Sequence, residues 1–514
     1  MSDTDSPLRP RQTTPQSLDD LAARFELSRV GEIAGISVRG ITVGTADVHA
    51  GDVFVGLPGS KRHGAEFAVK AREAGAAALL TDPAGAEVAR DSGLPILVAT
   101  EPRAILGAVS AWIYQTTAIE VPLFAVTGTN GKTSAVYFMA AILRQLGIPA
   151  GLSSTAERQV GKATTVSGLT TPEAPELHGM LARMVEDGVE AIAIEVSAQA
   201  LTRRRVGGVN FDVAGFTNLS HDHLDDYSDM PGYLRAKAAL FQDGRARRAV
   251  ISIDSTWGTE LLGLATVPFA TISSDPAIAA DWQIAITGEG PDGVSFTLTA
   301  REGGSVSTSI PVIGRQMAAN AGLAIAMLAE SGVSLSDISA AIESGIEVHI
   351  PGRIEKVSGD NGPSLFVDFG HGPDAFITTL DAVRHVTEGR ILMVFGASGD
   401  RDKTKRPAMA QAAVERSDIL IITDHHTRFE DGASIRATLL DAARRTDPGH
   451  ETLEEPDPSQ AIRAAVRLAR EGDSILWSGP GHLDYRDVRG VKIPFSARDE
   501  AREALREAGW PIAP

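Results

Sequence analysis

Short apolar runs alternate with longer segments of helical periodicity along nearly the whole chain. The strands that these runs predict lie at residues 38–43, 52–55, 76–80, 96–98, 121–126, 191–196, 213–216, 249–253, 365–369, 391–395, 419–423 and 474–477. Helices are predicted between them, including those at residues 67–74, 135–146, 408–415 and 460–470. Strands that alternate with helices are typical of an α/β fold with mostly parallel sheets.

The length of 514 residues exceeds what one hydrophobic core supports, so we expect several domains. The pattern of strands and helices divides the chain into units at residues 16–117, 118–348 and 349–514. Residues 1–15 are polar and rich in Pro and Thr. We expect them to form a disordered tail rather than a signal peptide, because they contain no apolar segment.

Composition narrows the classes of function. Hydrophobic residues make up 43% and charged residues 22% of the chain, as in an ordinary globular enzyme, and no apolar run approaches the ~20 residues that span a bilayer. The absence of cysteine excludes disulfides and thiolate chemistry and gives no reason to place the chain outside the cytoplasm. The net charge of −18 argues against nonspecific nucleic-acid binding. A polyanionic substrate must therefore meet local basic groups and backbone N–H donors.

A glycine-containing loop between a predicted strand and a predicted helix is the most specific motif. The residues expected to surround nucleotide phosphates are Gly128, Thr129, Asn130, Gly131, Lys132, Thr133 and Ser134. Lys132 would reach the terminal phosphates, and the Thr133 hydroxyl would bind Mg²⁺. The usual P-loop has a further glycine where this chain has Val126. The alternative is an ordinary strand-to-helix turn, but such a turn does not explain the Lys-Thr pair at the start of the helix.

Two strand ends downstream carry candidate metal ligands. Glu195 ends a predicted strand, where open α/β sheets bind ligands, and its carboxylate is suited to Mg²⁺; a strand-end glutamate without function is the alternative. His221, Asp222, His223 and Asp225 follow the next strand, and such a set tolerates Mg²⁺ or Mn²⁺. A polar loop with a helix-capping aspartate would produce the same pattern.

These segments, in this order, resemble the central domain of the Mur ligases, specifically the UDP-N-acetylmuramoyl-tripeptide synthetase (MurE) branch. The shared central motifs are the phosphate loop, Thr-Thr-Pro-Glu at 170–173, Glu-Val-Ser at 195–197, Phe-Thr-Asn-Leu at 216–219, Asp-His-Leu-Asp at 222–225 and Ala-Lys at 236–237. Those of the third unit are Pro-Gly-Arg at 351–353, Asp-Phe-Gly-His at 368–371, Gly-Asp-Arg-Asp-Lys at 399–403 and Gly-Pro-Gly-His at 479–482. The resemblance extends over residues 38–510.

The resemblance implies an ATP-dependent amide ligase with a tail at 1–15 and three domains. A UDP-type substrate-binding domain is expected at 16–117, an ATP-binding domain with a P-loop-type sheet at 118–348, and a Rossmann-like ligase domain at 349–514. A substrate carboxylate would attack the γ-phosphate of ATP, and an amine would attack the resulting acyl-phosphate. The branch adds an L-amino acid to UDP-MurNAc-L-Ala-D-Glu during peptidoglycan synthesis in the cytoplasm. We expect a monomer that acts on these small molecules, with no nucleic-acid or membrane partner.

Individual roles follow from the resemblance. The catalytic residues would be Lys132, Glu195, His223 and Lys237. The Mg²⁺ ligands would be Thr133, Glu195, His223 and Lys237, the last carbamylated by CO₂, although its helix taken alone favours a solvent-facing lysine. ATP would also contact Asn320, Arg353, Asp368 and His371. The substrates would contact Thr45, Thr170, Thr171, Ser197, Arg203, Arg205, Arg401, Asp424, His425, His426, Arg428 and Gly479.

The departures from the branch concentrate on substrate recognition. Thr45 keeps a hydroxyl where the branch has Asp-Ser-Arg, but its charged neighbours are missing. Members that add meso-diaminopimelate carry Asp-Asn-Pro-Arg and, in a second motif, a glutamate. Residues 424–428 here read Asp-His-His-Thr-Arg, and Leu483 stands in place of the glutamate. A leucine cannot pair with a distal ammonium, so we expect an amine other than meso-diaminopimelate: shorter, less charged or differently placed.

Two alternative functions remain open from the sequence. One is a MurE-like ligase recruited to another pathway, joining a different acid and amine, which the altered substrate motifs would suit. The other is a catalytically silent nucleotide-binding scaffold, which would have no use for a carbamylated Lys237. The sequence leaves the added amino acid, the acceptor and the carbamylation of Lys237 undetermined.

Overall fold

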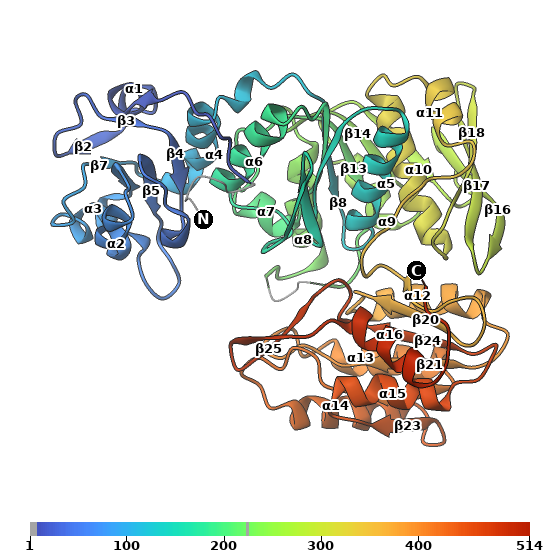
Figure 1. Ribbon diagram of the computed structural model, residues 1–514. Helices are drawn as coiled ribbons and strands as arrows, with labels where there is room; N and C mark the ends of the chain where they lie inside the picture. Colours follow the sequence, from blue (N-terminus) through green and yellow to red (C-terminus); the bar gives the residue numbers. More distant parts are fainter. Residues whose placement is uncertain (1–7, 223–225, 514) are drawn as a thin grey trace.

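The chain forms three α/β units, each built on its own sheet (Figure 1). The structure is a computed structural model that describes residues 8–222 and 226–513. The first and central units lie side by side, and the third lies across the lower face of the central unit in the view of Figure 1. Each strand and helix predicted from the apolar pattern has a counterpart within a few residues. The sheets are mostly parallel, as expected.

The first unit contains a five-stranded sheet of order β2-β7-β6-β5-β4, in which only the β2–β7 pair is antiparallel. Its strands are β2 (Ser28–Val30), β4 (Gly40–Thr42), β5 (Asp52–Gly56), β6 (Ala78–Thr81) and β7 (Ile96–Val98). A short pair, β1 (Gln16–Ser17) and β3 (Ser37–Val38), lies beside it, and the helices are α1 (Leu18–Arg24), α2 (Ala68–Glu73), α3 (Pro83–Val88) and α4 (Pro102–Ile113).

The central unit contains an eleven-stranded sheet of order β11-β10-β9-β12-β8-β13-β14-β15-β16-β17-β18. Its strands are β8 (Leu123–Thr127), β9 (Ala150–Ser153), β10 (Glu157–Val160), β11 (Ala163–Val166), β12 (Ala191–Glu195), β13 (Phe211–Phe216), β14 (Ala246–Ser252), β15 (Phe269–Ser273), β16 (Trp282–Gly290), β17 (Gly293–Ala300) and β18 (Ser305–Ile310). Six neighbouring pairs from β9 to β16 are parallel, and antiparallel hairpins form both ends.

Helices cover both faces of the parallel part of this sheet. They are α5 (Lys132–Gln145), α6 (Ala174–Glu186), α7 (Ala198–Thr202), α8 (Met230–Ala238), α9 (Thr256–Leu262), α10 (Arg315–Glu330) and α11 (Leu335–Ala341). Along β8, Phe124 and Val126 join the core that holds α5 and α10, whereas Leu123 and Ala125 join the core that holds α6 and α8. Because alternate side chains point to opposite faces, a strand buried on both faces must be apolar throughout, as this one is.

The third unit contains a six-stranded sheet of order β19-β20-β24-β21-β22-β23, parallel except for the β19–β20 pair. Its strands are β19 (Glu355–Lys356), β20 (Ser364–Asp368), β21 (Ile391–Phe395), β22 (Ile419–Ile422), β23 (Glu451–Glu454) and β24 (Ser474–Ser478), with a separate hairpin of β25 (Tyr485–Val488) and β26 (Val491–Pro494). The helices are α12 (Pro373–His385), α13 (Arg406–Arg416), α14 (Gly432–Thr446), α15 (Pro458–Leu468) and α16 (Ala497–Glu507).

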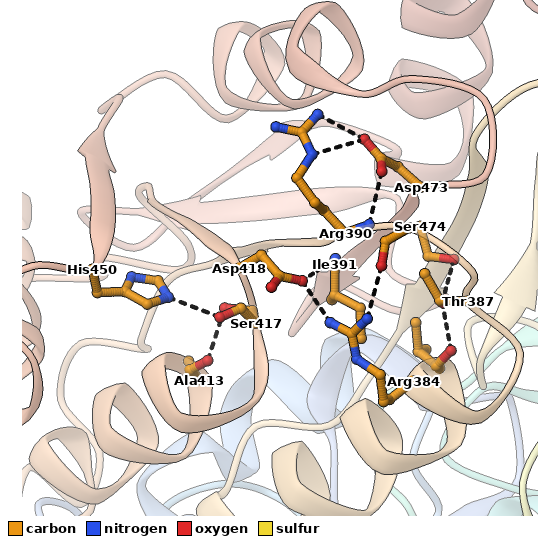
Figure 2. Close-up of polar contacts among 12 residues, drawn as sticks. Arg384, Thr387, Arg390, Ile391, Ala413, Ser417, Asp418, His450, Asp473 and Ser474 are labelled. Carbon is orange, nitrogen blue, oxygen red and sulfur yellow. Dashed lines mark hydrogen bonds and ion pairs between the residues drawn. The ribbon is translucent and has the colours of Figure 1, made fainter.

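Polar contacts fix the amino ends of three of these strands (Figure 2). The backbone N–H and the guanidinium of Arg390 both donate to Asp473, at 2.8 and 2.7 Å, which joins the start of β21 to the start of β24. Asp418, before β22, accepts hydrogen bonds from Arg384 and from the backbone of Ile391. The opposite, carboxyl edge of the sheet contributes Asp368, Phe369 and Gly370 to a cavity shared with the central unit.

We expected a disordered tail over residues 1–15, but residues 8–15 make defined contacts with the rest of the chain. Residues 1–7 lie outside the described part. The Arg9 guanidinium donates to Asp52 of β5 at 2.8 Å, and Arg11 donates to Asp187 after α6 at 2.5 Å. These contacts order a polar segment because its two arginines pair with carboxylates on two different units. The composition of the segment does not reveal those partners. Within residues 8–222 and 226–513, no helix is long and apolar enough to cross a bilayer.

Candidate active site

A cavity of about 680 Å³ lies between the central and third units, at the carboxyl ends of their parallel strands. Ligands of open α/β sheets bind at this edge. The predicted site residues that line it are Thr129, Asn130, Gly131, Lys132, Thr133, Ser134, Thr170, Glu195, Ser197, Arg205, Lys237, Asn320, Arg353, Asp368, His371 and Arg401. Residues more than 270 positions apart in the sequence therefore share one cavity.

The loop between β8 and α5 has the backbone conformation that its glycines predict. Gly131 has φ +85° and precedes the first residue of α5, and a Cβ at this position would lie 2.3 Å from the Asn320 side-chain oxygen. A Cβ at Gly128 would overlap the Thr217 hydroxyl at 1.8 Å. Only glycine fits these two positions, and α5 consequently begins at Lys132 with its N-terminal N–H groups toward the cavity.

Glu195 is buried at the end of β12 and is held by hydroxyl and amide donors. Its carboxylate accepts from the Thr133 hydroxyl at 3.0 Å, from the Thr155 amide at 2.8 Å and from the Thr155 hydroxyl at 2.9 Å. The Thr155 and Thr170 hydroxyl oxygens lie 3.0 Å apart, and Thr170 is the donor because the Thr155 proton goes to Glu195. The phosphate loop, the end of β9 and the start of the Thr-Thr-Pro-Glu motif therefore meet at one carboxylate.

Lys237 is 1% exposed, which contradicts the solvent-facing orientation that its helix alone favours. Its Nζ donates to the Gly128 carbonyl at 2.6 Å and lies 4.4 Å from the centre of the Tyr233 ring. Lys132 donates to the carbonyls of Gly128 and Thr129 at 3.0 and 2.7 Å. Burial, and then the charge of Lys132, hold the pKa of the Lys237 ammonium well below its ordinary value.

The third unit reaches the phosphate loop through Arg353. Its guanidinium donates to the Thr133 hydroxyl at 2.9 Å and stacks over the Phe369 ring, 4.4 Å from its centre. Burial raises the pKa of the Asp368 carboxyl, although Arg353 and backbone N–H groups oppose that shift. A second link joins Lys405 to Asp222 of the central unit at 3.3 Å. The two units thus contact each other along the wall of the cavity.

Some of the residues predicted to contact the acceptor substrate line the cavity, and the others lie elsewhere. Arg205 lines the cavity and donates to Glu173, and Thr170 and Ser197 also line it. Thr171 is fully buried and bonds the backbone of Glu195 and Ser197, so it holds the strand end. Arg203 is exposed just outside the cavity. Thr45 lies in a short 3-10 turn after β4 and lines neither this cavity nor the next.

A second cavity, of about 200 Å³, adjoins the first in the third unit. It is lined by Arg401, His425, His426, Arg428 and Gly479, all predicted to contact a substrate. Its wall shares Arg401, Phe369 and Leu483 with the larger cavity.

Asp424, which the sequence grouped with these residues, forms an ion pair with Arg436 and lines a smaller neighbouring cavity instead. His223, with Leu224 and Asp225, lies outside the described residues. Within the part of the chain that the structure describes, no three His, Cys, Asp or Glu side chains gather as a metal site.

Several residues that the sequence did not single out contribute to the two cavities. Thr155 follows β9 and bonds Glu195, and a polar residue after a buried strand could have marked it. Tyr485 and Asp487 of β25 line the second cavity, and His482 lines the first. Tyr485 and Asp487 lie in a hairpin that is too polar and short for a strand prediction, whereas His482 belongs to the Gly-Pro-Gly-His motif of the family resemblance, which gave it no role of its own.

Family models and relatives agree with this geometry. The models described as Mur ligase family, catalytic domain; Mur ligase middle domain; and Mur ligase, glutamate ligase domain match residues 37–115, 126–328 and 352–481. A UDP-N-acetylmuramyl-tripeptide synthetase of Leifsonia xyli subsp. xyli is 54% identical over 98% of this chain and 99% of its own. A UDP-N-acetylmuramoyl-L-alanyl-D-glutamate–2,6-diaminopimelate ligase of Streptomyces coelicolor is 39% identical, with 98% of each chain covered.

A solved structure of a UDP-N-acetylmuramoyl-L-alanyl-D-glutamate–2,6-diaminopimelate ligase is 25% identical to this chain and superimposes with a TM-score of 0.66. The superposition covers 97% of this chain and 100% of the other. The arrangement of three α/β units is therefore that of a known fold. This chain belongs to the Mur ligase family.

Proposed function

We propose that the protein is an ATP-dependent tripeptide synthetase that joins an L-amino acid to the D-glutamyl carboxylate of UDP-MurNAc-L-Ala-D-Glu. The observation that supports this best is the convergence of Lys132, Thr133, Glu195 and Lys237 on one cavity beside a second cavity that carries Arg401. The 54% identity to a tripeptide synthetase over nearly the whole chain favours this acceptor over an unrelated acid. We also propose that the protein acts as a monomer in the cytoplasm, where both substrates and ATP are in solution.

In the first step, a carboxylate oxygen of the acceptor bonds to the γ-phosphorus of ATP, and ADP leaves. The N–H groups at the start of α5 and the Lys132 ammonium offset the charge of the transferring phosphoryl group. Arg353 would leave the Thr133 hydroxyl and contact the phosphates, since both lie at the same cavity wall. The product is an acyl-phosphate, which the walls of the closed cavity keep from water.

Mg²⁺ fits the donors that face this cavity. The Thr133 hydroxyl and the Glu195 carboxylate are hard oxygen ligands 3.0 Å apart, which Mg²⁺ prefers, and the ion would supply positive charge next to the phosphates. We also propose that CO₂ modifies Lys237. The neutral amine forms a bond to the carbon of CO₂ and its surplus proton passes to solvent, which replaces the amine with an anion that carries two oxygen ligands. His223 completes the proposed set.

In the second step, the neutral amine of the amino acid bonds to the acyl carbon, phosphate leaves, and the surplus amine proton passes to solvent. Arg401 and Arg428 line the second cavity. The Arg401 guanidinium donates to the Asp400 carbonyl at 3.4 Å, and the Arg428 guanidinium donates to the Gly399 carbonyl at 3.5 Å and lies 3.9 Å from the Asp487 carboxylate. We assign them to the α-carboxylate of the amino acid, because guanidinium groups bind carboxylates well.

Phosphate release with ATP, Mg²⁺ and UDP-MurNAc-L-Ala-D-Glu tests this function directly. The expected result is release that requires an L-amino acid and a product whose mass is the acceptor plus that residue. Release that is independent of the acceptor, or supported only by a different carboxylic acid, would favour the recruited ligase instead.

A further inference from the structure

We propose that Glu430 is a positioning residue for the amino-acid substrate, because it joins the two loops that carry Arg401 and Arg428, the groups assigned to the α-carboxylate. The inference rests on the proposed ligase function and concerns a carboxylate that has no role in it so far. Glu430 is not among the residues that line either cavity, so it acts through the groups that it holds.

The two arginines come from loops that follow neighbouring strands. Arg401 lies in the loop between β21 and α13, and Arg428 lies in the loop between β22 and α14. The strands pair in parallel, so both loops leave the carboxyl edge of the sheet, where ligands bind. The loops meet where the Gly399 amide donates to the His426 carbonyl at 2.8 Å. The placement of the two guanidinium groups therefore depends on how these loops are joined.

Glu430 follows Arg428 by two residues and reaches across to the other loop. Its carboxylate accepts from the Arg406 guanidinium through two hydrogen bonds of 2.8 Å, lies 3.1 Å from the Lys403 Nζ and accepts from the Asp400 amide at 3.3 Å. Arg406 begins α13 and is 3% exposed, so this bidentate contact is directional and little screened by salt. The contacts hold the backbone on both sides of residue 401.

Left-handed backbone in both loops requires such a restraint. Asp400 has φ +50° and Arg428 has φ +51°, values that residues other than glycine rarely adopt. The Phe429 amide donates to the Asp400 carboxylate at 3.0 Å, which adds a second link between the loops. Loops that lost these links would relax toward ordinary φ values, and the guanidinium groups would turn with them.

The two guanidinium groups also repel each other. Burial, and then the charge of Arg401, lower the pKa of Arg428, and its nearest carboxylate, Asp487, lies at 3.9 Å, beyond hydrogen-bond distance. A substrate carboxylate would offset this repulsion, but the loops must hold the cations together before it binds. Because such preorganisation lowers the cost of binding, loss of Glu430 should weaken binding of the amino acid and not of ATP.

Steady-state kinetics of Glu430→Gln tests this role, since glutamine keeps the shape of the side chain but removes its charge. Full-length protein is assayed with ATP, Mg²⁺, UDP-MurNAc-L-Ala-D-Glu and the amino acid that the wild-type protein uses fastest among L-lysine, L-ornithine, L-2,4-diaminobutyrate, L-homoserine, L-alanine and meso-diaminopimelate. We expect KM for that amino acid to rise about tenfold or more, while KM for ATP and for the acceptor changes less than about twofold.

Asp400→Gly tests the link between the loops by a second route. Glycine accepts the left-handed backbone but loses the contact to Phe429, so KM for the amino acid should rise about fivefold, the scale of one hydrogen bond. Asp473→Asn is a matched control, because it removes a buried carboxylate that pairs with Arg390 at the opposite edge of the same sheet (Figure 2). This variant should lower the unfolding temperature but leave all three KM values unchanged.

The outcomes separate this role from the ligase function. An amino-acid KM that stays at the wild-type value in folded Glu430→Gln and Asp400→Gly would overturn the role of Glu430 and leave the ligase function intact. An equal rise in Asp473→Asn would do the same, because it would show a general effect of lost stability. No turnover by the wild-type protein with any amino acid of the panel would overturn both.

Discussion

The Nζ of Lys237 donates a hydrogen bond of 2.6 Å to the carbonyl oxygen of Gly128, inside the loop that faces the proposed phosphate position. A lysine from α8 thus lies against the first glycine of a motif more than a hundred residues earlier. The contact explains why burial of this side chain is compatible with the fold, since the backbone carbonyl satisfies a donor that water cannot reach. It also places the amine where a carbamate would face the phosphates.

Carbamylation of Lys237 is the first prediction. Because burial and the charge of Lys132 lower the pKa of this amine, its neutral, nucleophilic form is more available to CO₂ than that of an exposed lysine. Protein equilibrated with ¹³C-bicarbonate should show one carbamate carbon signal that is missing in Lys237→Ala. The variant should still bind ADP but lose kcat by about 10²–10³-fold, the scale of one lost electrostatic group. A wild-type spectrum without the signal, or an active alanine variant, would count against the modification.

Thr133 is predicted to act through its hydroxyl. Thr133→Val keeps the shape of the side chain but removes the contacts to Glu195 and Arg353. We expect kcat to fall about 10²-fold or more, since an oxygen ligand of the proposed metal is lost. Thr133→Ser should retain most of the activity, and titration with Mg²⁺ should show a raised requirement only for the valine variant. Equal activity of the two variants would show that the hydroxyl is dispensable.

Arg353 is predicted to couple the third unit to the nucleotide. Arg353→Ala removes a guanidinium that contacts the phosphate loop, so we expect KM for ATP to rise about tenfold, equivalent to ~1.4 kcal/mol. Arg384→Ala provides a matched control, because this arginine pairs with Asp418 at the opposite edge of the same sheet (Figure 2). A similar KM increase in both variants would indicate a general loss of domain structure instead.

Glu430 is predicted to make stability depend on acid pH. The hydrogen bonds from Arg406, at 2.8 Å each, lower the pKa of this carboxyl to about 2. A lowered folded-state pKa stabilises the protein above the ordinary value of ~4.3, and the contribution disappears as the pH falls through the window down to about 2. Urea unfolding of Glu430→Gln should therefore show a deficit at pH 7 that narrows below pH 4. A deficit that stays constant to pH 2.5 would argue against this ion pair.

The sequence predicted most of the parallel strands that are apolar on both faces, but it did not single out β9, β15 or β23, which also pair in parallel. It did not predict β16, β17 and β18, whose alternating residues bury only one face and whose runs contain glycine and serine. The order of Arg9 and Arg11 was also missed, because their carboxylate partners lie in distant segments.

The sequence predicted the motifs that form the site but not how these motifs are arranged in space. The loop at Gly128 and the carboxylate at Glu195 are visible locally, since each follows an apolar strand. The contact between Arg353 and Thr133 joins two domains and has no local signature. The burial of Lys237 opposes its helical pattern, and only the family resemblance pointed to it. The neutral state of His425 depends on surrounding side chains from several loops, which no spacing in the sequence encodes.

The most direct test of the account is amino-acid-dependent phosphate release with UDP-MurNAc-L-Ala-D-Glu, measured with wild-type protein and Lys237→Ala and followed by mass spectrometry of the product. We expect an acceptor extended by one L-amino acid residue, one phosphate released per product, and almost no product from the variant. Wild-type protein that binds ATP but leaves this acceptor unchanged with every amino acid supplied would contradict the proposed tripeptide synthetase.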